Sequence, residues 1–299
     1  MTYRATGLSL LPFLVACPTT TLPTPVDEVD THDSVATIED TGPVDTGWPV
    51  LSGEDIAMVD TDLDSVGLHL NAEQKFDAAA NVTWDMPIST GTALLCDHNG
   101  DGVDDIWLLT GGDDNLEITV YRNTGGDFAN SASYELAPGF SASNFSYGCG
   151  DLRGTGRGDF IAFRKDNKKL FLYPNDGGVL DVDNPFKATM TDSANSRWVI
   201  DDFDGDGKDE LGAFAGGRLT IYTMSGGLPQ TSNPLIEVEI PDDYAVTSLD
   251  LDADELADLA IWNGTAFVVW PGNGSGFDTT KAVAFTLTGT GTPVGANLR

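Results

Sequence analysis

Residues 202–222 read Asp-Phe-Asp-Gly-Asp-Gly-Lys-Asp-Glu-Leu-Gly-Ala-Phe-Ala-Gly-Gly-Arg-Leu-Thr-Ile-Tyr. An Asp-rich loop is followed by a short apolar run, a Gly-Gly turn and a second apolar run that ends in an aromatic residue. Short apolar runs between tight turns are typical of β-strands, and the stretch has no helical period of apolar residues. It therefore predicts two adjacent β-strands that are entered from an Asp-rich loop.

The same pattern recurs along the chain. An acid followed by an apolar run marks each copy, and these acids are Asp55, Asp105, Asp159, Glu210 and Asp258. Successive copies are 50, 54, 51 and 48 residues apart. Four short strands in about fifty residues make one blade of a β-propeller. We therefore predict that residues 51–299 form an all-β domain, a five-bladed propeller.

The two ends of this domain are expected to pair. The first copy lacks the strand that precedes the loop in the other copies. By the repeat spacing, the next such strand after Asp258 would fall at about residues 295–299. Pairing it with the strand near Ile56–Val59 closes the ring and removes two open sheet edges. We predict that residues 294–298 and 56–59 are neighbours in one sheet.

Three of the loops have the residues of a calcium site. Calcium takes six to eight oxygen ligands, and alternate side chains of a tight loop can supply them to one ion. The expected ligands are the side chains at loop positions one, three, five and nine and the backbone carbonyl at position seven. In order of position they are Asp97, Asn99, Asp101, Val103 and Asp105; Asp202, Asp204, Asp206, Lys208 and Glu210; and Asp250, Asp252, Asp254, Leu256 and Asp258.

Turns that bind no ion are the alternative for these loops, because Asp and Gly favour turns by themselves. The last loop also has Glu255 at position six, where the first and third have Gly. A residue with a side chain makes that turn more costly.

The loop at residues 151–159 has lost the pattern, because Arg153 and Thr155 stand at positions three and five. We predict that the Arg153 guanidinium takes the place of an ion and pairs with Asp151 and Asp159. The alternative is an exposed arginine without a partner.

The Asp-x-Asp-x-Asp-Gly loop, followed by an acid, an apolar residue and a strand, resembles the FG-GAP or VCBS repeat family. The resemblance covers about 245 residues, from Asp55 to Arg299. The propellers of integrin alpha subunits are its best-known members, so it implies calcium in the loops and a surface for ligand binding, adhesion or scaffolding. Integrin-type propellers have seven blades, and this departure weakens any transfer of their partners or binding face to a five-bladed ring.

The first 17 residues have the features of a bacterial lipoprotein signal. Arg4 gives a positive start, residues 8–16 form an apolar run too short to span a bilayer, and Leu-Val-Ala before Cys17 resembles a lipobox. We predict lipidation of Cys17; an ordinary signal peptide is the alternative. Residues 18–50, rich in Pro, Thr and acids, predict a disordered linker. The protein is then exported and anchored in the outer membrane or at the cell surface.

The charge of the chain excludes some classes of partner. Asp and Glu number 47 against 15 Lys and Arg, which gives a formal net charge of −32. Such a chain repels nucleic acid and anionic membranes. We expect a monomer that contacts a membrane only through its lipid anchor.

The cysteines of the folded part, Cys96 and Cys149, form no disulfide framework and no Cys-x-x-Cys motif. Buried free thiols are favoured. A disulfide between them remains the alternative, because an exported protein meets an oxidising environment.

The sequence contains no nucleophile elbow, phosphate-binding loop or zinc-binding helix motif. We therefore predict a binding, adhesion or scaffold module and not an enzyme, with an unknown protein or glycan as its ligand. A lectin is the first alternative, with Trp84 and Trp198 as stacking platforms for sugars. A polysaccharide-degrading enzyme is the second. His98 lies at an outward loop position and is expected to face solvent.

Overall fold

The structure is a computed structural model. It describes residues 54–60, 65–69, 76, 79–80, 82–85, 91–111, 115–124, 128–136, 144–190, 197–264, 266–287 and 292–296. Contacts divide the chain into Met1–Val44 and Asp45–Arg299, and all the described residues belong to the second unit. The predicted signal segment with Cys17 and the predicted linker lie outside them. No helix in the described part is long and apolar enough to cross a membrane.

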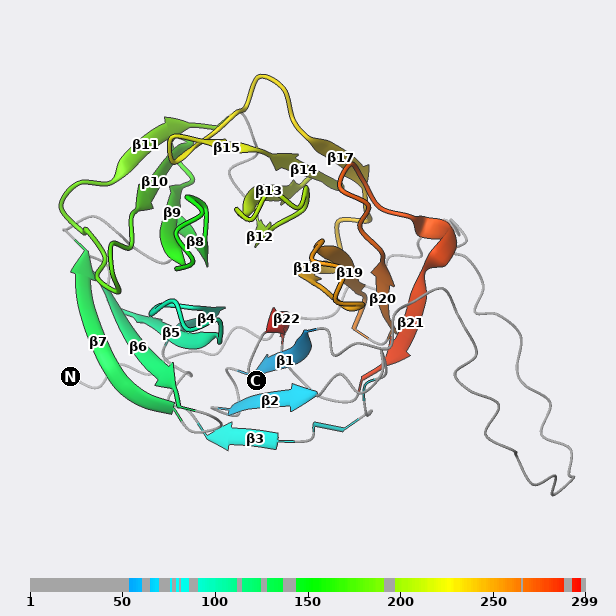
Figure 1. Ribbon diagram of the computed structural model, residues 1–299, viewed down its shortest axis with the longest axis horizontal. Coiled ribbons are helices and arrows are strands. Elements are labelled where there is room, and N and C mark those ends of the chain that lie inside the picture. Colours follow the sequence, from blue (N-terminus) through cyan, green and yellow to red (C-terminus); the bar gives the residue numbers. More distant parts are fainter. Residues whose placement is uncertain are drawn as a thin grey trace, which may run out of the picture. The chain divides into compact units, whose positions relative to one another are not determined.

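Five antiparallel sheets of four strands each surround a central axis (Figure 1). Each sheet is one blade, so the predicted all-β, five-bladed propeller is confirmed. From the axis outward, blade 1 has β22 (Thr292–Ala296), β1 (Asp55–Asp60), β2 (Ser65–His69) and β3 (Val82–Asp85). Blade 2 has β4 (Thr92–Cys96), β5 (Asp105–Thr110), β6 (Leu116–Asn123) and β7 (Phe128–Leu136).

The other three blades follow in chain order. Blade 3 has β8 (Phe145–Gly150), β9 (Asp159–Arg164), β10 (Lys169–Tyr173) and β11 (Phe186–Thr189). Blade 4 has β12 (Arg197–Asp201), β13 (Glu210–Ala215), β14 (Arg218–Tyr222) and β17 (Ile236–Glu239). Blade 5 has β18 (Ala245–Leu249), β19 (Asp258–Trp262), β20 (Ala266–Trp270) and β21 (Val283–Thr286). The remaining elements are the hairpin β15 (Met224–Ser225) and β16 (Leu228–Pro229) and the short 3₁₀ helix η1 (Thr279–Lys281).

The second strand of a blade is buried along most of its length. In β9 the first five residues, from Asp159 to Phe163, are all buried, and β5 and β13 have the same pattern. Both faces of such a strand pack on neighbouring sheets, which accounts for continuous apolar runs in place of alternation. The outermost strands β7 and β11 are largely exposed.

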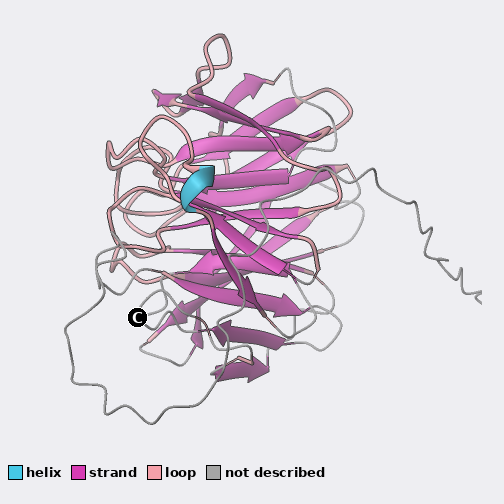
Figure 2. Ribbon diagram, turned by 90° about the vertical axis from the view of Figure 1, so that its right-hand side faces the viewer, coloured by secondary structure: helices cyan, strands magenta, loops and turns pink. Residues whose placement is uncertain are grey.

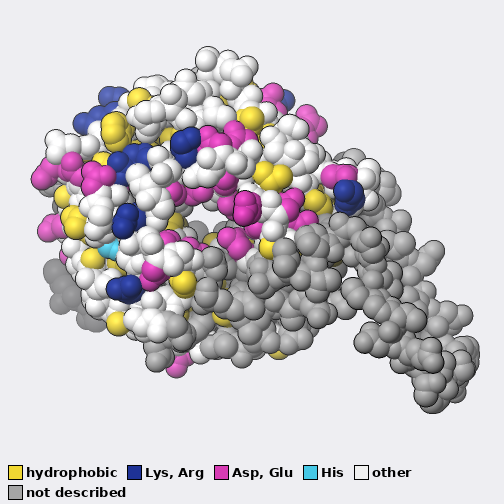
Figure 3. Space-filling view, in the orientation of Figure 1, with side chains coloured by type: hydrophobic (Ala, Val, Ile, Leu, Met, Phe, Trp, Pro, Cys, Tyr) yellow, Lys and Arg dark blue, Asp and Glu magenta, His cyan; other side chains and the backbone are white. Residues whose placement is uncertain are grey.

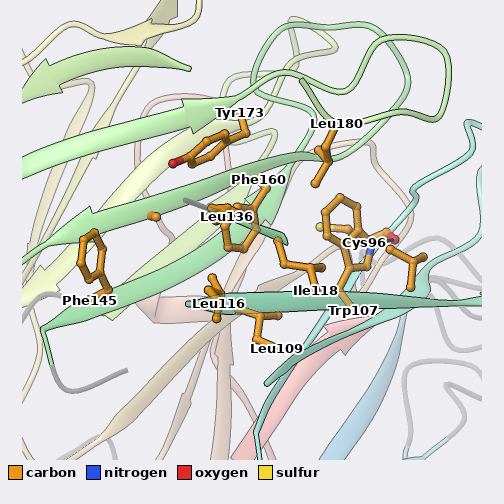
Figure 4. Packing of buried hydrophobic residues seen from close by; sticks show 12 residues of the cluster. Cys96, Trp107, Leu109, Leu116, Ile118, Leu136, Phe145, Phe160, Tyr173 and Leu180 are labelled. Atoms are coloured by element: carbon orange, nitrogen blue, oxygen red, sulfur yellow. Dashed lines mark hydrogen bonds between the residues drawn. The ribbon is translucent and has the colours of Figure 1, made fainter. Parts of the chain in front are cut away.

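Blades 2 and 3 pack through an aromatic cluster (Figure 4). Trp107 of β5 stacks on Phe160 of β9 with ring centroids 6.4 Å apart, and Tyr147 of β8 stacks on the same Phe160 ring at 5.8 Å. Trp107 and Phe160 have no exposed surface. Burial of one such side chain stabilises the fold by roughly 1.5–3 kcal/mol.

Cys96 and Cys149 form a disulfide, with their Cα atoms 6.1 Å apart. The prediction of free thiols is therefore wrong. The two residues are 53 apart in sequence, but each lies on the innermost strand of its blade, Cys96 on β4 and Cys149 on β8. The curvature of the ring brings these neighbouring strands together at the axis, and no local pattern in the sequence encodes that approach.

The predicted pairing of the two ends is confirmed. β22 pairs with β1 in antiparallel register, with Ile56 opposite Gly295 and Ala57 opposite Val294. Figure 1 shows β22 as the innermost strand of blade 1. The N–H of Gly295 also donates to Thr247 Oγ1 of β18 at 3.2 Å, so β22 connects blade 1 to blade 5 as well.

Removal of residues 292–299 should lower the free energy of unfolding far more than removal of residues 297–299 alone. The longer deletion takes away the inner strand of blade 1 and opens the ring, which exposes two sheet edges. Urea unfolding of the two truncated proteins measures the difference. Equal stability would contradict a closing role for β22.

A point substitution tests the same closure. A Cβ at Gly295 would collide with the backbone carbonyl oxygen of Ser248 in blade 5. Gly295→Ala should therefore destabilise the protein by about 2 kcal/mol. Gly276 has open space around its Cβ position, so Gly276→Ala is the matched control and should change stability by less than about 0.5 kcal/mol.

Candidate metal loops and the central channel

Four Asp-rich loops join the innermost strand of a blade to its second strand. We call them the first (97–105), second (151–159), third (202–210) and fourth (250–258) loops. In the third loop the Asp202 carboxylate accepts the N–H of Gly205 at 2.7 Å and of Gly207 at 2.8 Å. Asp97 accepts the N–H groups of the same two positions in the first loop, and Asp151 and Asp250 accept those of positions five and six in their loops. This residue therefore holds all four loops in the same tight turn.

Positions four and six of the loops are left-handed. In the third loop these positions are Gly205 and Gly207, with φ of 77° and 81°. In the fourth loop they are Ala253 and Glu255, with φ of 57° and 67°. A side chain in this region costs about 1–2 kcal/mol. The expected strain at Glu255 is present, and Ala253 adds a second strained position that the sequence analysis did not identify.

The closing acid at position nine ties each loop to its blade. Asp105 is fully buried and accepts the N–H of His98 at 3.1 Å and of Asn123 at 2.8 Å. Asp258 accepts the two equivalent N–H groups of its own blade at 3.0 and 2.7 Å. Desolvation by burial raises the pKa of Asp105 to about 6 and of Asp258 to about 8. A cation in the loop would offset this cost of burying the charge.

In the third and fourth loops the carboxylates at positions one, three and five converge. One oxygen from each acid lies within 4.8 Å of the others in the two sets Asp202, Asp204 and Asp206, and Asp250, Asp252 and Asp254. Asp252 Oδ1 is buried and has no hydrogen-bond partner among the described residues. Desolvation, followed by the charges of Asp204 and Asp202, raises the pKa of Glu210 to about 8. Calcium coordinates such carboxylate oxygens, so these residues fit the ion.

The position-seven residues of these three loops are held against the acid at position five. The N–H groups of Val103, Lys208 and Leu256 donate to the carboxylates of Asp101, Asp206 and Asp254 at 3.1, 3.0 and 3.0 Å. The residues that were predicted to offer carbonyl oxygens therefore lie beside the predicted side-chain ligands.

The first loop has a positive neighbour that the sequence analysis did not foresee. Arg122 of β6 places Nη2 3.1 Å from Asp101 Oδ2, and both side chains are exposed. Asn99 Nδ2 is buried without a hydrogen-bond partner among the described residues. Asn99 replaces one acid in the first loop, whereas the third loop keeps that acid but also has a positive neighbour, with Lys208 Nζ 2.5 Å from Asp206 Oδ2.

The second loop holds a guanidinium group as predicted, but with a different second partner. Arg153 Nε lies 3.0 Å from Asp159 Oδ1, and its Nη2 lies 2.9 Å from Asp176 Oδ1. The prediction of a pair with Asp151 is wrong in this respect, because the Asp151 carboxylate accepts the N–H groups of Thr155 and the residue after it. Arg153 reaches outward to the turn after β10 and donates to the Asn175 carbonyl at 2.9 Å.

A cavity of about 1040 Å³ on the axis is lined by the innermost strands of all five blades. Figure 3 shows the opening with acidic side chains around it. Desolvation raises the pKa of Asp201 to about 6, and desolvation with the charge of Asp201 raises the pKa values of Glu54 and Asp209 well above the ordinary range. The sequence analysis missed these acids. For Glu54 and Asp209 the signal is an acid at position eight, directly before the closing acid, whereas Asp201 lies directly before position one of the third loop.

Three charged side chains that line this channel form hydrogen bonds with backbone groups. Asp209 Oδ2 accepts the N–H of Asp151 at 2.5 Å, and Glu54 Oε2 accepts the N–H of Asp250 at 3.2 Å. Arg157 also lines the cavity, and its Nε donates to the carbonyl of Asn99, at 3.1 Å. These contacts give the groups a role in holding the loops.

Two further expectations about ring side chains are corrected. His98 does not face solvent: it is 5% exposed, its Nε2 lies 2.9 Å from Tyr134 Oη, and its ring meets Trp107 edge to face. Trp198 is not an open stacking platform, because Nε1 donates to Ser146 Oγ at 3.0 Å and the ring packs edge-on against Phe163. The Trp198 ring lies in the junction between blades 3 and 4, whereas the His98 ring packs within blade 2. The side chain of Trp84 lies outside the described residues.

No protein-family model and no curated protein matches the chain. Among solved structures, an Agrocybe aegerita lectin that recognises non-reducing terminal N-acetylglucosamine is 16% identical over 79% of this chain and 78% of its own, with a TM-score of 0.44. AofleA from Arthrobotrys oligospora is 10% identical over 85% of this chain and 77% of its own, with a TM-score of 0.42. The Photorhabdus luminescens Tc holotoxin pore is 17% identical over 75% of this chain, which spans only 12% of the toxin chain; the TM-score is 0.40. The propeller architecture is established by the strand pairing described above and not by these similarities.

Arg153→Ala should destabilise the protein by about 3 kcal/mol even in saturating calcium, because it leaves the buried Asp159 carboxylate without a counter-charge. Arg218 pairs with Glu237 on the surface, so Arg218→Ala is the matched control and should cost less than about 1 kcal/mol. Urea unfolding at fixed calcium measures both. Equal effects of the two substitutions would show that Arg153 does not act as a buried counter-ion.

Proposed function

We propose that this protein is an exported, lipid-anchored, calcium-binding propeller that acts as a ligand-binding, adhesion or scaffold module. The proposal rests on the two neighbouring loops in which three carboxylates converge within 4.8 Å. Like charges at that distance repel one another, and a divalent cation relieves the repulsion. The buried, unpartnered Asp252 Oδ1 supports the proposal, because a buried oxygen without a partner costs stability unless a ligand satisfies it.

Calcium suits these loops better than magnesium. Calcium accepts six to eight oxygens in flexible geometry, whereas magnesium needs a near-ideal octahedron and retains several waters. Each loop offers side-chain oxygens at four positions and a backbone carbonyl at a fifth, which leaves little room for retained water. The resemblance to FG-GAP and VCBS repeats supports the same ion.

The proposed calcium sites lie on one face of the ring. Each loop follows the innermost strand of its blade, so the loops of neighbouring blades lie next to one another around the axis. Figure 2 shows loops gathered on one side of the strands. Calcium would reduce the negative charge of this face and hold its loops in one conformation, and a rigid surface loses less entropy when it binds a ligand.

The fold does not identify the class of ligand, so a binding experiment must identify it. We propose a protein or a glycan as the partner, tested by applying the purified protein to protein and glycan arrays with calcium and with a chelator. Binding that requires calcium and is weakened by Asp206→Asn supports a role for the loops. Binding that is unaffected by the chelator and by Asp206→Asn would contradict that role.

Chelation of calcium should lower the melting temperature clearly. Extracellular calcium modules have dissociation constants near 10⁻⁴–10⁻³ M, and a site at ten times its Kd adds about 1.4 kcal/mol. Three filled sites would then shift the melting temperature by roughly 10 °C. Differential scanning calorimetry with calcium, with magnesium and with chelator measures this shift, and magnesium should restore little of it. A melting temperature indifferent to chelator would contradict calcium binding at all three loops.

Cys17→Ser should release the protein from membrane fractions, because the proposed anchor is a lipid on this thiol. Fractionation of cells that express each form measures the change. Replacement of Cys96 and Cys149 together by Ser is the control, since it removes the other cysteines of the chain and should leave the membrane association unchanged. Membrane association that survives Cys17→Ser would contradict the anchor.

A further inference from the structure

The second, third and fourth loops are each hydrogen-bonded to the loop before them, and the residue before β1 is bonded to the fourth loop in the same way. The backbone N–H at position eight donates to the carbonyl at position one of the preceding loop. The four bonds are Gly158 to Asp97 at 2.6 Å, Asp209 to Asp151 at 3.1 Å, Ala257 to Asp202 at 2.9 Å and Glu54 to Asp250 at 2.7 Å. The last bond comes from the residue before β1, which holds position eight in the copy without a loop.

Side chains strengthen the same junctions. The residue at position seven packs on position four of the preceding loop, where a glycine leaves room for it. A Cβ placed on Gly205 would lie 2.9 Å from Leu256 Cδ2, and one on Gly100 would lie 3.0 Å from Arg157 Cζ. Leu256 therefore contacts the third loop with its side chain, while its backbone belongs to the fourth.

The hydrogen bond and the expected ion share one peptide group. The carbonyl of Leu256 is a proposed ligand in the fourth loop, and the N–H of the same peptide, on Ala257, donates to Asp202 of the third loop. The two ends of a trans peptide group point in opposite directions. A cation at the carbonyl polarises the group and strengthens the hydrogen bond from its N–H. That bond holds Asp202, the residue whose carboxylate organises the third loop.

We infer that the third and fourth loops bind calcium cooperatively and that the first loop binds it independently of both. The inference rests on the proposed calcium sites. The third and fourth loops are joined directly, whereas the second loop, with Arg153 in place of an ion, separates the third loop from the first. Because the second loop binds no ion, calcium does not alter it directly, and it does not transmit an effect between the first and third loops.

The experiment uses the full chain and calcium alone, with loops disabled at position five. Asp101→Asn, Asp206→Asn and Asp254→Asn each remove one charged ligand but keep an oxygen that can accept the N–H from position seven. Pairs of these substitutions leave one working loop, and single substitutions leave two. Calorimetric titration with calcium chloride gives the affinity of each loop alone and in each pair.

The third loop should bind calcium about fivefold more tightly when the fourth loop works than when it does not, and the fourth loop should gain equally from the third. The first and third loops together should titrate as the sum of the single loops. If the third and fourth loops also titrate as that sum, the coupling is refuted while the calcium sites stand. If the unaltered protein binds no calcium, both proposals fail.

A second pair of variants tests whether the coupling depends on the contact between the third and fourth loops. Leu256→Ala keeps the carbonyl and removes the contact with Gly205, and Arg157→Ala removes the equivalent contact between the second and first loops. In the protein with working third and fourth loops, Leu256→Ala should reduce the coupling and Arg157→Ala should leave it unchanged. Any other pattern would overturn the assignment of the coupling to this junction.

Discussion

The buried carboxylate that closes each loop is the interaction on which the rest of the propeller depends. Asp105 accepts one N–H from the start of its loop and another from the end of the third strand of its blade, and Asp258 does the same. One side chain therefore joins the loop, the second strand and the third strand at one edge of the sheet. A fully buried charge is costly unless it is paired. The need to pair it determines what each loop must contain.

The blades meet this need in two ways. In the third and fourth loops, acids gather beside the closing acid and together offer a cation several oxygens. In the second loop Arg153 supplies a permanent positive charge to the buried Asp159. Both loops keep the same backbone turn, because the acid at position one accepts the backbone N–H groups in either case. The repeat can therefore hold an arginine at the place where the proposed ion would bind, without a change in the fold.

The axis of the ring carries a second set of constraints. Its innermost strands come together there, and the position-eight acids Asp209 and Glu54 reach back to the backbone of the preceding loop. Backbone hydrogen bonds between successive loops run alongside these contacts. The second, third and fourth loops are therefore connected to the loops before them around the channel, and each connection is made by a single peptide group.

Much of this was determined by the sequence alone. The spacing of the closing acids indicates five blades, and the strand absent from the first copy indicates that the end of the domain must supply it, because an open sheet edge is unfavourable. Only the tertiary structure decided the bond between Cys96 and Cys149, which joins blade 2 to blade 3. It also decided two contacts within blades: the burial of the His98 ring against Trp107 and Tyr134, and Asp176 in place of Asp151 as the second partner of Arg153. The repeat shows only the residues that recur in every blade, so a partner that one blade alone uses, such as Asp176 for Arg153, leaves no repeated signal. Contacts between blades depend on the curvature of the closed ring, which joins residues some fifty positions apart and leaves no period in the sequence.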